Sequence, residues 1–150
     1  MAQIKLKIVT PEKIVFEHDV YQATLLVEGG EVTILPDHIS YIGAIKAGEI
    51  MLREKSGGEE ISLVTSGGFV EFHDNILMVL ADTAERAEEI DLARAEEARL
   101  RAEKLQKEQA HVSAEEYART AALIEKEIAR VKVARKRHSE RGISLGNGVF

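Results

Sequence analysis

The residues of this chain whose types and spacing could do chemistry gather in the segment 85–95. Asp91 and Arg94 place a carboxylate and a guanidinium three residues apart, on one face of a predicted helix. An arginine can neutralise a phosphate, and a neighbouring carboxylate can orient that arginine. The same pair also fits a plain helix start, in which Asp91 accepts from first-turn amides and Arg94 makes a surface ion pair. The spacing alone leaves both interpretations open.

The sequence excludes an ATP-hydrolysing site of the P-loop type and a catalytic zinc site. No G-x-x-x-x-G-K-[ST] phosphate-binding loop is present, and the glycine pairs are expected to close β turns. The chain has no cysteine, and its histidines do not show the spacing of zinc ligands; they are His18, His38, His73, His111 and His138. We therefore expect a protein without catalytic residues and without a metal.

The chain changes its hydrophobic pattern near Ala84. Before that residue apolar side chains alternate, as at Ile4, Leu6 and Ile8, and turn signals recur at short intervals, including 47–49 and 66–68. This pattern predicts about ten short strands. We expect residues 1–85 to form a β-sandwich of two packed sheets.

The remainder predicts an antiparallel two-helix hairpin over residues 86–141. The first helix runs to about Gln109, and Ser113 with Glu116 forms a capping box that begins the second. We expect Gly142 to end the second helix and residues 142–150 to form a flexible tail. The predicted seam joins Ala95, Ala98, Ala102 and Leu105 to Tyr117, Ala121, Ile124, Ile128 and Val131. Because alanine buries little area, the hairpin should open at small cost.

Charge is distributed unevenly along the chain. The net charge is -6, but residues 130–141, which we call the basic segment, carry +5 and leave -11 for the rest. The acidic remainder would repel nucleic acid, and no aromatic side chains interleave the cations. We favour an acidic protein surface as the target, and a solvated helix end is the alternative.

Neither a signal peptide nor a membrane span is predicted. The N-terminus alternates from its first residues, and the longest strongly apolar run, 76–81, is too short to cross a bilayer. We expect a soluble intracellular protein with no direct membrane insertion.

Four short motifs resemble the epsilon subunit of F-type ATP synthases. The resemblance extends from about Ile4 to about Arg137, and the order and spacing of the motifs make it specific. The motifs are Val9-Thr10-Pro11-Glu12, Gly29-Gly30-Glu31-Val32-Thr33-Ile34-Leu35-Pro36-Asp37-His38, Ser66-Gly67-Gly68-Phe69-Val70-Glu71 and Ala84-Glu85-Arg86-Ala87.

This resemblance implies a non-catalytic central-stalk rotor subunit that helps to couple proton transport to ATP synthesis. Its β-sandwich would bind the gamma subunit and rest on the c-ring, so the protein would be peripheral at the cytoplasmic face of the bacterial inner membrane. Glu31 and His38 match positions that face the c-ring in the family. Without the resemblance they are an ordinary turn acid and turn histidine.

The resemblance also implies two dispositions of the hairpin. It lies folded against the sandwich, or it extends into the α/β catalytic ring and hinders ATP hydrolysis. In the extended state, cations of the basic segment would contact acidic parts of the ring. Such charge complementarity raises the rate of association and fixes the binding orientation more than it raises the affinity. The candidate contacts are Arg130, Lys132, Arg135, Lys136 and Arg137.

Some members of the family bind ATP on the folded hairpin through an Ile/Leu-Asp-x-x-Arg-Ala signature. Ile90 to Ala95 fulfils this signature, which makes ATP an expected regulatory ligand, although no cofactor is required. Lys126 stands where those relatives have an arginine, and a lysine lacks the planar fork of a guanidinium. The full candidate set is Glu85, Ile90, Asp91, Arg94, Ala95, Arg101, Lys126 and Arg130.

A different class of protein also fits the pattern. A free-standing β-sandwich adaptor that dimerises through its helices would show the same change of period near Ala84. Purification alone and alongside a gamma-type partner separates the two interpretations, because the adaptor self-associates and the rotor subunit pairs with gamma.

Overall fold

The structure, a computed structural model, describes residues 2–109 and 112–146 of the 150-residue chain, with side chains described up to residue 140. The chain divides into two compact units, Met1–Arg86 and Ala87–Phe150. We call them the β unit and the helical unit, and each is described by itself.

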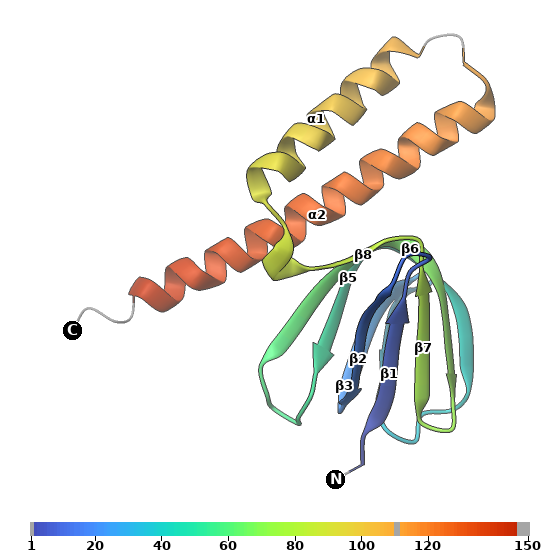
Figure 1. Cartoon of the computed structure of the whole chain (residues 1–150), viewed down its shortest axis with the longest axis vertical. Coiled ribbons are helices and arrows are strands. Elements are labelled where there is room, and N and C mark those ends of the chain that lie inside the picture. Colours follow the sequence, from blue (N-terminus) through green and yellow to red (C-terminus); the bar gives the residue numbers. More distant parts are fainter. Residues whose placement is uncertain (1, 110–111, 147–150) are drawn as a thin grey trace. The chain divides into compact units, whose positions relative to one another are not determined.

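The described part of the β unit contains eight strands, which form one continuous sheet that curls around a single core (Figure 1). The strand order is β2-β1-β7-β6-β5-β3-β4, and β8 pairs with β6. Adjacent strands are antiparallel except β1 and β7, which are parallel. The strands are β1 (Ile4–Val9), β2 (Ile14–Val20), β3 (Gln22–Val27), β4 (Gly30–Ile34), β5 (Tyr41–Arg53), β6 (Glu60–His73), β7 (Ile76–Ala81) and β8 (Ala84–Arg86). The predicted β-sandwich is confirmed.

The prediction of about ten short strands is wrong because two strands are long. β5 has 13 residues and β6 has 14, and both continue through the glycines that we took for turns. β6 pairs with β8 over Leu63–Thr65 and with β7 over Gly68–His73, so one strand serves two neighbours in succession. A Cβ on Gly68 would collide with the Leu80 carbonyl oxygen, and the φ of Gly68 is 151°. Glycine is required here for close backbone approach rather than for a turn.

The core of the β unit follows the predicted alternation. Ile4, Leu6 and Ile8 are each at most 2% exposed, while the intervening lysines point to the other face. Phe72 and Leu77 on the adjacent strands are equally buried. Because a strand places successive side chains on opposite faces, the outer face carries whatever lies between these core residues.

The helical unit is an antiparallel hairpin, as predicted. A 3₁₀ turn, η1 (Ala87–Glu89), leads into α1 (Leu92–Glu108), and α2 (Ala114–Gly146) returns beside α1 (Figure 1). Asp91 caps α1, since its Oδ1 accepts from the Arg94 amide at 3.1 Å. The Ser113 hydroxyl accepts from the Glu116 amide at 3.2 Å, which is the predicted cap of α2.

The seam differs from the predicted one on both helices, since Leu105 of α1 is 45% exposed and is not part of it. Tyr117 and Ile128 are 52% and 47% exposed, so they do not form the buried stripe. The buried stripe on α2 keeps the predicted Val131 and adds Thr120, Glu127 and Ala134. Polar side chains are tolerated there because they have partners: Thr120 donates to Gln109 Oε1 at 2.9 Å, and Glu127 pairs with Arg130. Hydrophobic periodicity does not reveal such a stripe, because two of its four side chains are polar.

The predicted helix end at Gly142 is also wrong, because α2 continues to Gly146. A glycine inside a helix costs about 1 kcal/mol relative to alanine, which weakens a helix without ending it. The rest of the predicted tail, residues 147–150, lies outside the described residues. Among the helices within 2–109 and 112–146, none combines the length and apolar character needed to cross a bilayer.

Candidate functional site

The outer face of the sheet carries a row of apolar side chains across five strands. Cross-strand pairing aligns Ile14 with Val9, Val9 with Leu80, Leu80 with Phe69, and Phe69 with Ala44. We call these five residues the apolar belt. Phe69 is 64% exposed and Leu80 is 53% exposed. Contiguous apolar surface of this kind marks contact sites on soluble proteins.

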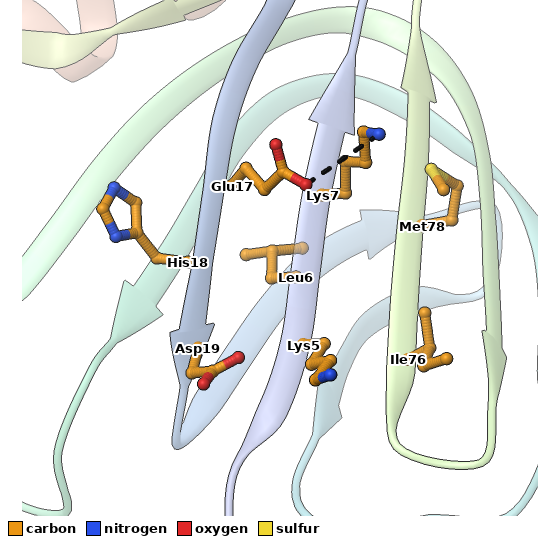
Figure 2. Close-up of a pocket in the computed structure, with 8 residues that line it drawn as sticks. All are labelled: Lys5, Leu6, Lys7, Glu17, His18, Asp19, Ile76 and Met78. Atoms are coloured by element: carbon orange, nitrogen blue, oxygen red, sulfur yellow. Dashed lines mark ion pairs between the residues drawn. The ribbon is translucent and has the colours of Figure 1, made fainter.

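Charged residues lie directly beside the belt. The next row along the strands pairs Glu17 with Lys7, Lys7 with Met78, and Met78 with Glu71. Lys7 Nζ lies 3.9 Å from Glu17 Oε1 (Figure 2). A shallow pocket of about 430 Å³ lies at this charged row, and Lys5 and Ile76 also line it. An apolar centre with a charged rim is the usual composition of a protein interface.

His38, one of the two candidate c-ring contacts, lies in a braced loop at one end of the sandwich. Asp37, at a φ of 65°, and Asn75 clamp two loops together: the Asp37 amide donates to Asn75 Oδ1 at 2.7 Å, and Asn75 Nδ2 donates back to Asp37 Oδ1 at 3.0 Å. The His38 ring packs edge-on against Phe72, with centroids 5.9 Å apart. Glu31 is exposed in β4, and no hydrogen bond or ion pair among the described residues joins it to His38.

At the start of α1, two of the candidate nucleotide residues, Asp91 and Arg94, interact with each other. Asp91 serves as the cap, and Arg94 Nε lies 3.9 Å from Asp91 Oδ2, with 85% of the Arg94 side chain exposed. This is the arrangement expected of a plain helix start. Ile90 is half-buried just before the cap, and Ala95 is fully buried in the seam. Glu85 belongs to the β unit, in β8 opposite Val64.

The remaining candidate nucleotide residues lie on both helices. Glu96 contacts Arg135 and Gln109 contacts Thr120, so Arg101 on α1 lies level with about residue 130 on α2. Arg130, however, pairs with the buried Glu127 at 2.7 Å, with the two side chains 19% and 6% exposed. A guanidinium that is neutralised in this way attracts a phosphate less strongly than a free one. Lys126, one turn before Arg130, is half-buried.

A hollow of about 590 Å³ lies at the start of α1, but its lining is acidic. Glu88, Glu89, Asp91 and Glu96 contribute carboxylates, and His138 of α2 completes the rim. Carboxylates repel a triphosphate, so this hollow does not suit ATP. Within the described residues, which exclude His111, no group of three or more carboxylates or histidines is arranged to hold a metal.

The basic segment lies partly against the start of the helical unit. Arg135 donates from Nε to Glu96 Oε1 at 3.1 Å, and Arg137 Nη2 lies 3.5 Å from Glu88 Oε2. Lys132 is exposed, and Lys136 is half-buried.

Three features of the candidate sites were not predicted from the sequence: the belt, the buried Glu127, and the carboxylates that pair with the basic segment. One sign of the belt was present in the sequence. The run 76–81 is apolar at every position, so a strand formed by it is apolar on both faces. Glu127 left none, because a charged residue in a helix is normally exposed.

The fold is a β-sandwich that carries an exposed apolar belt, followed by a two-helix hairpin. Residues 3–87 match the family model of the β-sandwich domain of the ATP synthase delta/epsilon chain. The ATP synthase epsilon chains of two Dehalococcoides mccartyi strains are each 47% identical over 91% of this chain and 96% of the relative. That of Desulforamulus reducens is 44% identical over 66% of this chain and 74% of the relative. The chain belongs to the ATP synthase epsilon chain family.

Solved structures share the fold at low identity. A chain in the Euglena gracilis mitochondrial ATP synthase, in a structure containing OSCP, F1 and the c-ring, gives a TM-score of 0.72 at 21% identity, covering 86% of this chain and 79% of that chain. A chain in the central stalk and c-ring structure of the Tetrahymena thermophila mitochondrial ATP synthase gives 0.60 at 14% identity, covering 87% and 96%.

Proposed function

We propose that this chain is the rotor subunit of an F-type ATP synthase that attaches to gamma and the c-ring and inhibits ATP hydrolysis through its hairpin. It carries no catalytic residues of its own, and it helps to couple proton transport to ATP synthesis. The observation that carries the proposal is the apolar belt, in a chain 47% identical to ATP synthase epsilon chains. As part of that complex, the protein sits peripherally at the cytoplasmic face of a bacterial inner membrane.

We assign the belt to the contact with gamma. Phe69 and Leu80 project from neighbouring strands of a rigid sheet, so little conformational entropy is lost when a partner covers them. The charged row at Lys7 and Glu17 supplies the rim that sets orientation.

The c-ring contact is assigned to Glu31 and the His38 loop. The mutual hydrogen bonds of Asp37 and Asn75 hold that loop in one conformation. A braced loop transmits torque to a neighbour better than one that yields.

The hairpin is the regulatory element. Its α1 side contributes only Ala95 and Ala102 as fully buried residues, so the seam is held by few apolar contacts. In the extended state, Arg130, Lys132 and the cations at 135–137 bind acidic parts of the α/β ring. Those contacts stabilise the extended form relative to the closed one.

ATP is a regulatory ligand of the closed hairpin, and we expect it to bind weakly. Arg94 and Arg101 share a helix face, with Arg130 level across the seam. The engagement of Arg130 by Glu127, the lysine at 126 and the acidic hollow each reduce the affinity for a triphosphate.

Co-purification tests the proposal. The full chain should form a one-to-one complex with gamma and remain monomeric alone, as measured by light scattering after size exclusion. A chain that forms a stable dimer and does not retain gamma would instead be the free-standing adaptor.

A further inference from the structure

Two arginines of the basic segment are held by carboxylates far away in the sequence. Arg135 bonds to Glu96, 39 residues earlier, and Arg137 bonds to Glu88, 49 residues earlier. The Arg135 guanidinium contacts Glu96 Oε1 through both Nε and Nη2. Because the partners come from η1, α1 and α2, these contacts exist only while the hairpin is closed.

The surroundings of these carboxylates favour cations. Glu89 and Asp91 line the same hollow as Glu88 and Glu96, and α2 contributes His138 to it. The four neighbouring carboxylates create a negative potential at the place where the basic end of α2 returns. The side chains of Arg135 and Arg137 are 58% and 34% exposed, so both ion pairs remain in contact with solvent and can break.

We propose that Glu88 and Glu96 form an acidic latch, which holds Arg135 and Arg137 in the closed hairpin and withholds them from the catalytic ring. The inference rests on the proposed function, because it supplies the regulation of the inhibitory hairpin. The latch carboxylates occupy the cations that the extended state needs. Closure and inhibition therefore compete for the same two guanidinium groups.

The latch is weak enough to be reversible. An exposed ion pair shifts an equilibrium by about twofold, and two such pairs shift it by about fourfold. A pair of this strength biases the hairpin without locking it, so ligands or rotor contacts can still decide its position.

The direct test replaces both latch carboxylates, Glu88→Gln with Glu96→Gln, in the full chain. The matched control is Glu97→Gln with Glu125→Gln, which makes the same change of charge at two exposed positions of the hairpin, one on α1 and one on α2. Amide hydrogen exchange of α1 and α2 in the isolated protein should be about fourfold faster in the latch variant and unchanged in the control. Equal exchange in the latch variant and the wild type would overturn the latch.

A charge swap tests the pairing itself. Glu96→Arg should speed exchange by removing the acceptor and adding repulsion, and Glu96→Arg with Arg135→Glu should restore most of the protection. If the single variant opens the hairpin and the swap does not close it, Glu96 acts within α1 and the latch is overturned.

Hydrolysis by the assembled enzyme separates the latch from the inhibitory function. With Glu88→Gln and Glu96→Gln, inhibition should exceed that of the wild type, because Arg135 and Arg137 are released for the ring. Faster exchange without a change in hydrolysis would support the latch and contradict the proposed inhibitory role of the hairpin. Unchanged exchange would contradict the latch whatever the hydrolysis rate.

Discussion

Phe69 provides the sharpest test of rotor attachment. Its side chain is the most exposed member of the apolar belt among the large apolar residues, at 64%, and Leu80 lies opposite it on β7. Phe69→Ser removes the ring and leaves the strand pairing of β6 intact. The variant should therefore separate binding from folding.

The magnitude follows from the exposed area. A phenylalanine buries about 200 Å² when fully covered, so covering the exposed part of Phe69 removes about 130 Å² from water. At about 25 cal/mol per Å² this contributes about 3 kcal/mol. Ordering costs at the interface reduce the net gain, so we expect a loss of about 1 to 3 kcal/mol, or roughly fivefold to 150-fold in Kd. Stability should fall by less than about 1 kcal/mol, from the lost cross-strand contact.

Calorimetric titration into an F1 subcomplex that contains gamma and lacks this chain measures the effect. Leu105→Ser is the matched control, because Leu105 is 45% exposed on α1, outside the belt. The control should bind like the wild type. A folded Phe69→Ser variant that binds within about twofold of the wild type would refute the assignment of the belt to gamma.

Three further predictions concern the fold, the extended state and the nucleotide. Gly68→Ala should destabilise the β unit by more than about 3 kcal/mol in urea unfolding, because the added Cβ would meet the backbone of β7. The control is Gly29→Ala, which should change stability by less than about 1 kcal/mol because the space around its Cβ is open. Lys132→Gln removes an exposed cation that is not part of the latch. Inhibition of ATP hydrolysis should therefore weaken, while the free energy of unfolding changes by less than about 0.5 kcal/mol. Unchanged inhibition would show that Lys132 does not contact the catalytic ring. ATP at a hundredfold above its Kd should stabilise the closed hairpin by about 2.7 kcal/mol and raise its melting temperature. Arg94→Ala should abolish this thermal shift. If the wild type at millimolar ATP shows neither a thermal shift nor a heat of binding in calorimetry, residues 90–95 are a structural helix start.

Local features of the fold were predictable because their causes lie within a few residues. The alternation of Ile4, Leu6 and Ile8 is a property of one strand, and the cap at Ser113 involves only the next turn. The glycines at 67 and 68 were misread because a glycine pair signals both a tight turn and a close approach of two backbones. Only the pairing of β6 with β7 tells these apart.

The surface sites were harder to predict because they depend on pairing between distant segments. The belt joins Val9 to Leu80 through a parallel pair of strands, and nothing near either residue specifies that register. The latch likewise requires that the basic end of α2 returns to Glu88 and Glu96. The charge distribution of the sequence indicated that the basic segment binds an acidic surface. It did not indicate that the same chain supplies acidic partners for that segment.

We propose that the hairpin, and not the β unit, restrains ATP hydrolysis. The most direct measurement compares the hydrolysis rate of the assembled enzyme carrying the full chain with that of the enzyme carrying a chain that ends after Ala87, close to the division between the two units. The shortened chain keeps all eight strands described in the β unit, so it should fold and remain bound to gamma while hydrolysis rises. A shortened chain that is bound to the enzyme and leaves the hydrolysis rate at the full-chain value would contradict the claim.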